Sequence, residues 1–234
     1  MRNKVIFQDL GEIDFKDAWE YQEKLFDEIV SVKGKNWDLP PGEQIKIKNH
    51  LLFCEHPHVY TLGKNGSENN LLIDQMQLKA KDASFYKINR GGDITYHGPG
   101  QIVGYPIFDI ELFGVRIKQY INKLEESIIM TLDEFNLKGE RLKNGTGVWL
   151  DTGIPGNARK ICAIGVRASR FVTMHGFAFN VNTNLEYFKY INPCGFIDKG
   201  VTSLEKEAGA KIDINKVKMI VRKKMGEVFN FTAY

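Results

Sequence analysis

The stretch that says most about the fold runs from Ile161 to Asn182 and reads ICAIGVRASRFVTMHGFAFNVN. Residues 161–168 and 171–182 are both rich in β-branched and aromatic side chains, and little more than Ser169 and Arg170 separates them. Two such segments joined by a short polar link are typical of a β-hairpin. We therefore predict an antiparallel pair of strands in this part of the chain.

Further strands and helices are predicted on either side of this hairpin. Segments with the same strand-like composition are 50–55, 85–89 and 102–108. Apolar residues recur at helical spacing over residues 15–30 (behind Asp14 as N-cap), 115–135 and 214–225. Residues 31–42 are interpreted as a surface loop. Because strands outnumber helices and do not alternate strictly with them, we expect an α+β fold, a mixed or antiparallel β-sheet flanked by helices.

The overall composition limits the class of protein. A chain of 234 residues is expected to form one domain, residues 1–234. A net charge of +3 gives nucleic-acid binding no real support. No apolar run has the roughly 18 residues of a membrane span, and the first residues lack the apolar core of a secretion signal. Cys54, Cys162 and Cys194 are too few and too irregular for a disulfide framework, so we expect a cytoplasmic protein.

The segment RGGDITYHGPGQ, residues 90–101, combines four glycines with an arginine and a histidine. Glycines allow positive φ and close approach of the backbone to a ligand. Such a loop can direct several N–H groups at a carbonyl or phosphate oxygen. A tight connection between two strands collects the same residue types, and composition alone leaves both interpretations open. The two phosphate-binding patterns, GxxxxGK[ST] and GxGxxG, are not matched.

Cys194 lies in the segment YINPCGF, residues 190–196. Pro193 restricts the backbone of Asn192, and Gly195 frees the backbone after the cysteine, so the thiol is expected on a rigid bend. A nucleophile is one interpretation, and a small buried core residue is the other. The spacing of Thr202 and Glu205 predicts a capping box and the start of a helix.

Lys160 stands at the start of the apolar segment 161–168. A lysine in this position is commonly a solvated charge that protects a sheet edge. The functional alternative is an ammonium beside a thiol, where it stabilises the thiolate and transfers a proton. Cys162, with apolar neighbours, is expected in the core rather than as the nucleophile.

Two other clusters of polar residues have the composition of a binding site. The alternation of Cys54, His56 and His58 is possible for a metal site, but Pro57 interrupts the strand and no fourth ligand has a recognisable spacing. We therefore expect no metal. The basic residues of the last helix are expected to form its solvated face, with a docking patch for an acidic carrier protein as the alternative; they are Lys216, Lys218, Arg222, Lys223 and Lys224.

Taken together, these segments resemble the octanoyltransferase family of lipoate biosynthesis, the LipB family. The matching motifs are RGGDITYHGPGQ (90–101), GVW (147–149), KIC (160–162), HGFAFNVN (175–182) and INPCG (191–195). The resemblance implies the fold shared by biotin and lipoate protein ligases and an acyltransferase that needs no cofactor.

The resemblance also implies a reaction and its site. An octanoyl group would pass from octanoyl-acyl carrier protein to Cys194, and then to a lysine on lipoyl domains of glycine-cleavage H protein and 2-oxoacid dehydrogenase E2 subunits. Lys160 would lower the pKa of the thiol and later take a proton from the incoming amine. Glycines would make room for the alkyl chain. The implied acyl site comprises Arg90, Gly91, Gly92, Asp93, Ile94, Thr95, Tyr96, His97, Ala163, Ile164, Gly165, Gly176, Phe177 and Ala178.

Three other functions remain open at this point. An ATP-dependent lipoate or biotin protein ligase would have the same fold but needs no nucleophilic cysteine. A thioesterase would release the same acyl-enzyme to water. A non-catalytic module would bind an acyl chain or its carrier without turnover.

Overall fold

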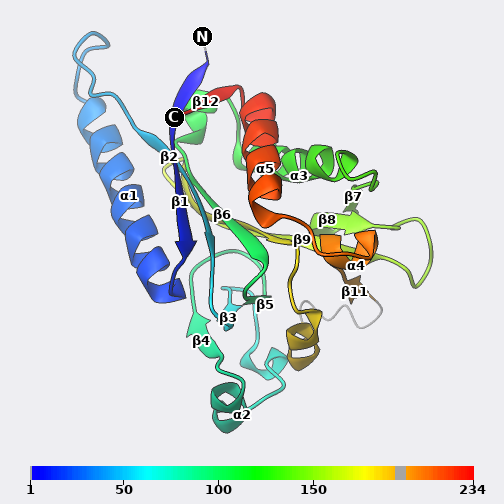
Figure 1. Cartoon of the computed structure of the whole chain (residues 1–234). Coiled ribbons are helices and arrows are strands. Elements are labelled where there is room, and N and C mark those ends of the chain that lie inside the picture. Colours follow the sequence, from blue (N-terminus) through cyan, green and yellow to red (C-terminus); the bar gives the residue numbers. More distant parts are fainter. Residues whose placement is uncertain (1, 193–198) are drawn as a thin grey trace.

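The computed structural model describes residues 2–192 and 199–234. Figure 1 shows how the helices and strands are arranged. In chain order, with η for short 3₁₀ helices, they are β1 (Asn3–Glu12), α1 (Phe15–Asn36), β2 (Asn49–Glu55), β3 (Val59–Leu62), η1 (Glu68–Asn70), α2 (Gln75–Ala80), β4 (Ser84–Lys87), β5 (Ile94–His97), β6 (Gln101–Ile107), η2 (Ile110–Phe113), α3 (Ile117–Asp133), β7 (Glu140–Leu142), β8 (Gly145–Leu150), β9 (Arg159–Ser169), β10 (Val172–Asn180), η3 (Leu185–Tyr190), β11 (Gly200–Val201), α4 (Leu204–Ala208), α5 (Ile214–Phe229) and β12 (Phe231–Ala233).

Most strands form one large mixed β-sheet in the order β12-β1-β2-β6-β10-β9-β8-β7, and β11 pairs with β9. The predicted hairpin is formed by β9 and β10, which pair antiparallel. Its turn holds Arg170 and Phe171 at positive φ (51° and 62°). β1 pairs in parallel with β2 and β12, whereas the pairs from β2 to β8 are antiparallel. The α+β class with a mixed sheet and flanking helices is therefore confirmed.

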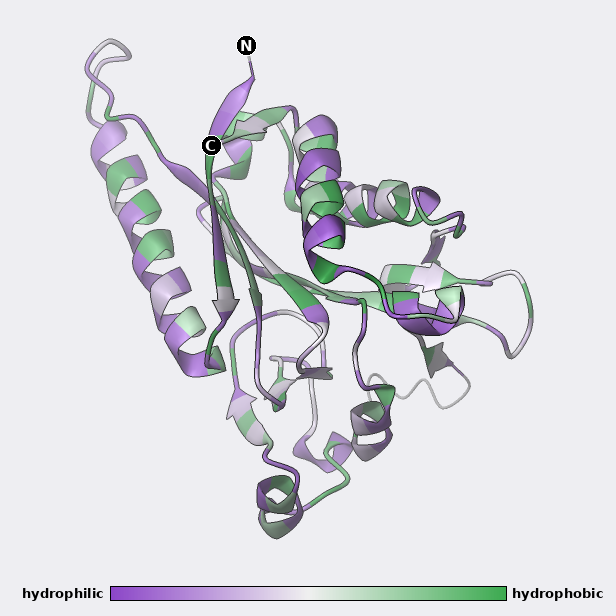
Figure 2. Cartoon of the chain, in the orientation of Figure 1, coloured by the Kyte–Doolittle hydropathy of each residue, from purple (hydrophilic) through white to green (hydrophobic). Residues whose placement is uncertain are grey.

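Helix α1 covers one face of the large sheet (Figure 1). It begins at Phe15 because the Asp14 carboxylate accepts the N–H of Lys16 at 2.8 Å, which satisfies one of the free donors of the first turn. Figure 2 shows the alternation of hydrophobic and hydrophilic residues along this helix. The apolar residues Ala18, Leu25, Phe26 and Ile29 pack on β2, β6 and β10. Burial of this stripe, rather than helix propensity, fixes the position of α1.

Helices α3 and α5 cover the opposite face (Figure 1). Asp213 caps α5 by accepting the N–H groups of Asn215 and Lys216. The buried residues of both helices join inward-facing residues of the strands in the largest apolar cluster of the described chain; from the helices these are Tyr120, Leu124, Ile128, Leu132, Val217, Val221, Met225 and Phe229.

A small sheet, in the order β4-β3-β5, lies below the large one. β5 pairs antiparallel with β3, and β4 pairs in parallel with it. Because β5 occupies residues 94–97, the segment 90–101 is not one irregular loop as expected. The segment consists of a turn, the buried strand β5 and a second turn. The backbone of β5 forms hydrogen bonds with β3.

Several other predictions need correction. The surface loop predicted for residues 31–42 starts later, because α1 continues to Asn36. Lys33 extends from that last turn to Asp109, with 2.6 Å between Nζ and Oδ1. The helix after residue 202 exists, but its cap is Ser203, whose Oγ accepts the N–H of Lys206; the Thr202 hydroxyl is bonded to Glu207 instead.

The solvated face predicted for the last helix is also partly wrong. Lys218 is 7% exposed, and its ammonium lies between Asp9 of β1 and Glu55 of β2. Burying its charge between two carboxylates offsets the loss of water around it. In the part of the chain that the structure describes, no helix has the length and apolarity needed to cross a membrane.

Candidate active site

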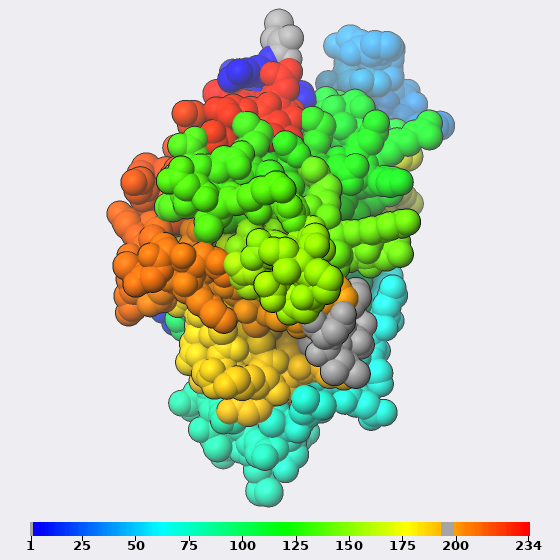
Figure 3. All heavy atoms as spheres, turned by 90° about the vertical axis from the view of Figure 1, so that its right-hand side faces the viewer, coloured from blue at the N-terminus to red at the C-terminus, as the bar shows by residue number. Residues whose placement is uncertain are grey.

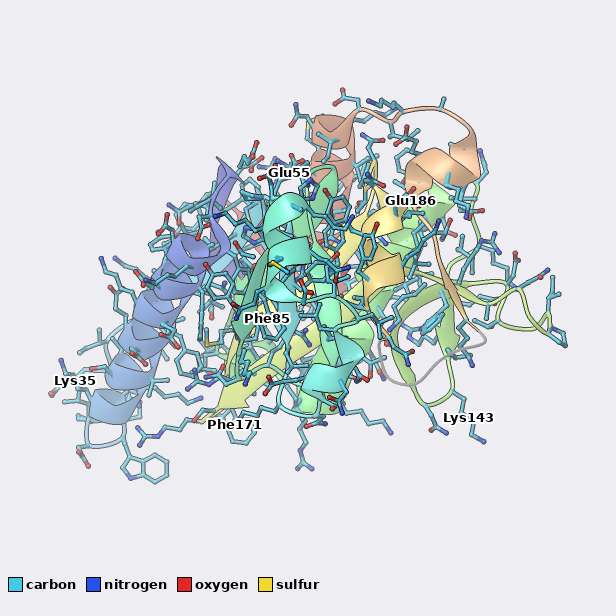
Figure 4. All side chains as sticks on the ribbon, turned by 90° about the horizontal axis from the view of Figure 1, so that it is seen from below. Lys35, Glu55, Phe85, Lys143, Phe171 and Glu186 are labelled. Atoms are coloured by element: carbon cyan, nitrogen blue, oxygen red, sulfur yellow. The ribbon has the colours of Figure 1, made fainter. Side chains whose placement is uncertain are left out.

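A cavity of about 950 Å³ opens on the α1 side of the large sheet. Its floor consists of residues of β6, β9 and β10, and its walls come from the start of α1, β5, η3, the β7–β8 turn and β11. In the space-filling view of Figure 3, the connection between β8 and β9 (yellow-green), α4 (orange) and η3 (yellow) lie on one face. Figure 4 looks from below, where the small sheet, with Phe85, lies between α1 and η3, with Glu186.

Small and apolar side chains form the floor. Ala163 of β9 is opposite Ala178 of β10, and Ala178 is opposite Val103 of β6, so the three side chains form one row across the sheet. Tyr105 adds its ring beside them. A floor of this kind favours an alkyl group over a charged ligand, because it offers apolar contact and little polar surface.

Lys160 lines the same cavity. β9 is an interior strand here, because Lys160 is paired with Trp149 of β8 and with Val201 of β11. The lysine therefore does not protect a sheet edge. Its Nζ lies 4.6 Å from the centroid of the Trp149 ring, a cation–π distance. Trp149 is 2% exposed and donates its indole N–H to the Gly145 carbonyl, so the platform under the ammonium is fixed.

The predicted nucleophile Cys194 lies outside the described residues. The chain on either side of it is described, and both Asn192 and Lys199 line the cavity. Asn192 donates its backbone N–H to the carbonyl of Asn70 at 2.8 Å. The lysine of the predicted pair and the residues flanking the cysteine segment thus border one cavity.

The other two cysteines are buried core residues. Cys162, as predicted, lies in the cluster under α3 and is fully buried. Cys54 is equally buried, with its Sγ 3.5 Å from Nε2 of His56. Burial raises the pKa of both thiols, because it penalises the thiolate. His58, the third residue of the Cys54, His56 and His58 group, forms a hydrogen bond with the Tyr96 hydroxyl.

Most residues of the predicted acyl site do border the cavity; they are Arg90, Gly92, Asp93, Ile94, Thr95, His97, Ala163, Ile164, Gly165, Gly176, Phe177 and Ala178. Gly91 and Tyr96 are not among the described lining residues. Gly91 donates its N–H to the Val166 carbonyl. Tyr96 is fully buried behind the wall, where its ring stacks on Tyr187 at 5.0 Å.

Arg90 shapes the turn before β5. Its guanidinium donates to the backbone carbonyl of Thr61 at 2.6 Å and to the Thr61 hydroxyl at 3.0 Å. Asp93 accepts from the N–H of Ile94 and from the side chain of Asn70. Arg90 thus joins the turn before β5 to β3, and Asp93 joins it to η1. Both side chains therefore hold this part of the cavity wall in place.

Gly165 and Gly176 are required where two stretches of backbone approach each other closely. A Cβ on Gly165 would lie 2.9 Å from the Gly91 carbonyl oxygen, and one on Gly176 would lie 2.2 Å from the Gly104 carbonyl oxygen. A real Cβ does not approach backbone so closely. These two glycines therefore allow protein backbone to approach protein backbone, and both also line the cavity.

His97 belongs to a buried hydrogen-bond chain. The amide nitrogen of Gln101 donates to the Tyr96 carbonyl (3.2 Å) and to Oδ1 of Asn180 (2.9 Å). Its oxygen must therefore accept from Nδ1 of His97 at 2.8 Å, which places the imidazole proton on Nδ1. Asn180 continues the chain by donating to the Thr202 carbonyl. Burial, then the nearby His56, lower the pKa of His97 to about 3, so the ring is neutral.

Gly100 connects the motif at 90–101 to the one at 175–182. Its carbonyl accepts the N–H groups of Val181 (3.2 Å) and Asn182 (2.8 Å) and the hydroxyl of Thr183 (3.2 Å). Its φ is +79°, and a Cβ would lie 2.5 Å from the Asn182 carbonyl oxygen. Only glycine fits there. The two motifs are thus parts of one packed junction beneath the cavity.

Several lining residues were not predicted as site residues; Phe15, Val103, Tyr105 and His175 are among them. Phe15 was assigned to the buried stripe of the first helix, and no signal in the sequence distinguishes it from a core residue. His175 has positive φ (58°), and its backbone N–H bonds to the side-chain oxygen of Gln22 on α1 at 3.0 Å. Positive φ is uncommon outside glycine and concentrates at functional sites. Burial lowers its pKa to about 3.

Comparison with known proteins agrees with this architecture. Residues 14–226 match the lipoyl protein ligase A/B catalytic domain. A protein named octanoyltransferase from Flavobacterium johnsoniae is 57% identical over 234 residues, covering 98% of both chains. One of the same name from Parabacteroides distasonis is 55% identical over 225 residues, covering 95% of this chain and 97% of its own.

Solved structures show the same fold at low sequence identity. A bipartite lipoate protein ligase from Thermoplasma acidophilum has a TM-score of 0.68 at 13% identity and covers 99% of this chain and 86% of its own. Lipoate-protein ligase A bound with ATP has a TM-score of 0.66 at 13% identity and covers 100% and 89%. The chain therefore belongs to the lipoyl protein ligase A/B catalytic domain family and, within it, to the octanoyltransferases, which are acyltransferase enzymes.

Proposed function

We propose that this chain moves an octanoyl group from octanoyl-acyl carrier protein to a lysine of a lipoyl domain, with Cys194 as the acyl carrier and Lys160 as its activating partner. The observation that supports the pair is that Lys160 lines the same cavity as Asn192 and Lys199, the described residues closest in sequence to Cys194 on each side. The apolar floor supports an alkyl substrate, and the other two thiols are buried with raised pKa values.

In the first half-reaction the Cys194 thiolate attacks the carbonyl carbon of the carrier thioester. A new carbon–sulfur bond forms, and the bond to the carrier sulfur breaks. The Lys160 ammonium favours the thiolate before attack and gives its proton to the departing carrier thiolate. The products are an octanoyl-thioester enzyme, a free carrier thiol and a neutral Lys160.

In the second half-reaction the ε-amine of the acceptor lysine attacks the enzyme thioester. The carbon–nitrogen bond of an amide forms, and Cys194 leaves as a thiolate, which is a good leaving group. Neutral Lys160 takes the proton that the amine loses and returns to its ammonium form. Both halves together need neither ATP nor a redox partner.

The proposed acceptors are the lipoyl domains of glycine-cleavage H protein and of 2-oxoacid dehydrogenase E2 subunits. The name of the relatives supports octanoyl transfer in lipoate biosynthesis, and the fold is shared with lipoate protein ligases, whose substrates include such domains. A ligase mechanism would instead require ATP, and a thioesterase would release free octanoate.

The test is to incubate the protein with octanoyl-acyl carrier protein without ATP and measure the intact mass. We expect one octanoyl group per chain that hydroxylamine removes and that a lipoyl domain accepts as an amide. Cys194→Ala is expected to carry no adduct. Cys162→Ala is the matched control, because it removes a buried thiol close to Lys160 in sequence, and should keep the adduct.

Three results would contradict the proposal. They are an adduct on Cys194→Ala, a requirement for ATP, and release of octanoate at the same rate with and without the lipoyl domain. The last would indicate a thioesterase.

A further inference from the structure

We propose that Phe15, the first residue of α1, forms the end wall of the acyl cavity and sets the longest acyl chain that the enzyme accepts. The inference rests on the proposed function for the identity of the substrate, and on the cavity itself for the position of the wall. Phe15 is 2% exposed and borders the cavity although it belongs to a helix that otherwise packs on the sheet.

The cavity has two chemically different ends. Lys160 belongs to β9 and pairs with Val201 of β11, shortly after the cysteine segment, and Asn192 directly precedes that segment. Tyr105 belongs to β6, which is separated from β9 by β10, and Phe15 lies on the Tyr105 side, because it contacts His56, which bonds to Tyr105. Ile88 packs with Phe15. An acyl thioester has the same polarity, with a reactive carbonyl at one end and an alkyl tail at the other. The tail therefore points toward Phe15.

The floor gives the length of the path. The row Ala163, Ala178 and Val103 crosses from β9 over β10 to β6. Neighbouring strands lie about 4.8 Å apart, so this row spans about 10 Å, close to the length of an extended octanoyl chain. The side chains grow from alanine to valine along the row.

Phe15 is linked to the β6 end of this row through His56 and Tyr105. Its ring is nearly parallel to that of His97, with centroids 6.0 Å apart, and meets His56 edge-on at 5.4 Å. Nε2 of His56 lies 2.7 Å from the Tyr105 hydroxyl, which fixes Tyr105 beside Val103 on β6. Both histidines have lowered pKa values, first because of burial, so the wall is uncharged.

The space behind Phe15 is apolar. The ring stacks on Tyr86 of β4 at 5.5 Å and lies 6.3 Å from Trp19, in a cluster with Val59 and Ile88. A smaller side chain at residue 15 would extend the cavity into this cluster. A longer alkyl chain would then bury its extra methylenes there instead of meeting an aromatic ring.

The experiment compares acyl carriers bearing octanoyl, decanoyl and dodecanoyl groups. The readout is the rate of acyl-enzyme formation by intact mass for wild type, Phe15→Ala and Phe15→Leu. We expect the ratio of the dodecanoyl to the octanoyl rate to rise by tenfold or more in Phe15→Ala, and by less in Phe15→Leu. Phe26→Ala is the matched control; Phe26 is a buried phenylalanine on the same helix that lies outside the described cavity lining, and its ratio should stay at the wild-type value.

A second readout does not depend on catalysis. Binding of free octanoate, decanoate and dodecanoate is measured by calorimetry on the same variants, with Phe15→Leu as the variant least disturbed in packing. A wild-type protein that takes no acyl adduct but binds octanoate best, with a shift to dodecanoate in the Phe15 variants, supports the wall and contradicts the thioester mechanism. Unchanged chain-length ratios in both readouts, or the same shift in Phe26→Ala, overturn the inference.

Discussion

The two faces of the large sheet are built in different ways. Under α3 and α5 the packing is mainly apolar, with side chains such as Leu124 and Phe179 fully buried, and the buried Lys218 is paired with carboxylates. Under α1 the same strands carry Tyr105 and His175, and His56 follows β2 directly; all three form buried hydrogen bonds, and this face borders the cavity. The face under α3 and α5 contributes mainly to stability, whereas the face under α1 is less fully packed because it contains the cavity.

This difference shows why the site can be chemically unusual. A buried polar group costs stability unless its hydrogen bonds are made, so its partners must be held in place by well-packed surroundings. The apolar packing on the opposite face of the same strands provides these well-packed surroundings. Substitutions on the two faces should therefore separate stability from activity, and the following changes test that separation in order of decreasing effect.

The largest effect is expected on the cavity face. Lys160→Ala should slow acyl-enzyme formation by about 10²–10⁴-fold, because it removes the ammonium that favours the thiolate and donates the proton. The pH profile of Cys194 alkylation, followed by mass spectrometry of the peptide, should move to higher pH.

Lys138→Ala is the control for this change, because Lys138 is an exposed lysine whose ion pair is with Glu140 on β7. It should leave both the rate and the profile unchanged. If the alkylation profile of Lys160→Ala coincides with wild type, Lys160 has no activating role.

The next effect is expected on the opposite face. Leu124→Ala should lower the free energy of unfolding by about 2–5 kcal/mol, because it leaves a cavity in the apolar cluster. The rate of acyl-enzyme formation per folded molecule should be unaltered. Urea unfolding and the acylation rate are measured on the same preparation. A rate that falls well below wild type in a fully folded sample would show that the two faces are not separable.

The smallest effect concerns pH. The pKa of His97 is about 3 in the folded protein, against an ordinary value of 6.5. Between these values the unfolded chain binds one more proton at this residue, so the free energy of unfolding falls as the pH drops from 6.5 toward 3. Between pH 6.5 and 3 the free energy of unfolding of His97→Gln should fall less with each pH unit than that of wild type. The expected difference between the two slopes is about 1 kcal/mol per pH unit.

Urea unfolding of wild type and His97→Gln at pH 7, 6 and 5 measures this difference in slope. Equal slopes would mean that His97 is not held neutral by burial. His175, whose pKa is also about 3, should show the same behaviour when replaced by glutamine.

Sequence patterns predicted the elements whose signals are local. The stripe behind Asp14 and the hairpin of β9 and β10 fall where expected, because periodicity and turn residues act within a few positions. Lys218 was assigned to solvent, since nothing nearby reveals Asp9 and Glu55, which neutralise its charge from β1 and β2.

Sequence motifs also predicted much of the candidate site, but not all of it. Lys160 and most of the acyl-site residues border one cavity, because each lies in a motif that can be identified in the sequence. Phe15 could not be found in that way. Its position at the cavity depends on Tyr86 and His97, which lie far away in the sequence and meet it only in the folded protein.

The hydrogen bonds around the cavity also bear on how the protein folds. The bond between His175 and Gln22 joins residues 153 positions apart, and the bond between Thr183 and Gly100 spans 83 positions. Closing loops of this size costs chain entropy before the contacts can form, which makes such contacts slow. The cavity should therefore assemble late, after the local helices and hairpin, and no short fragment of the chain is expected to contain it.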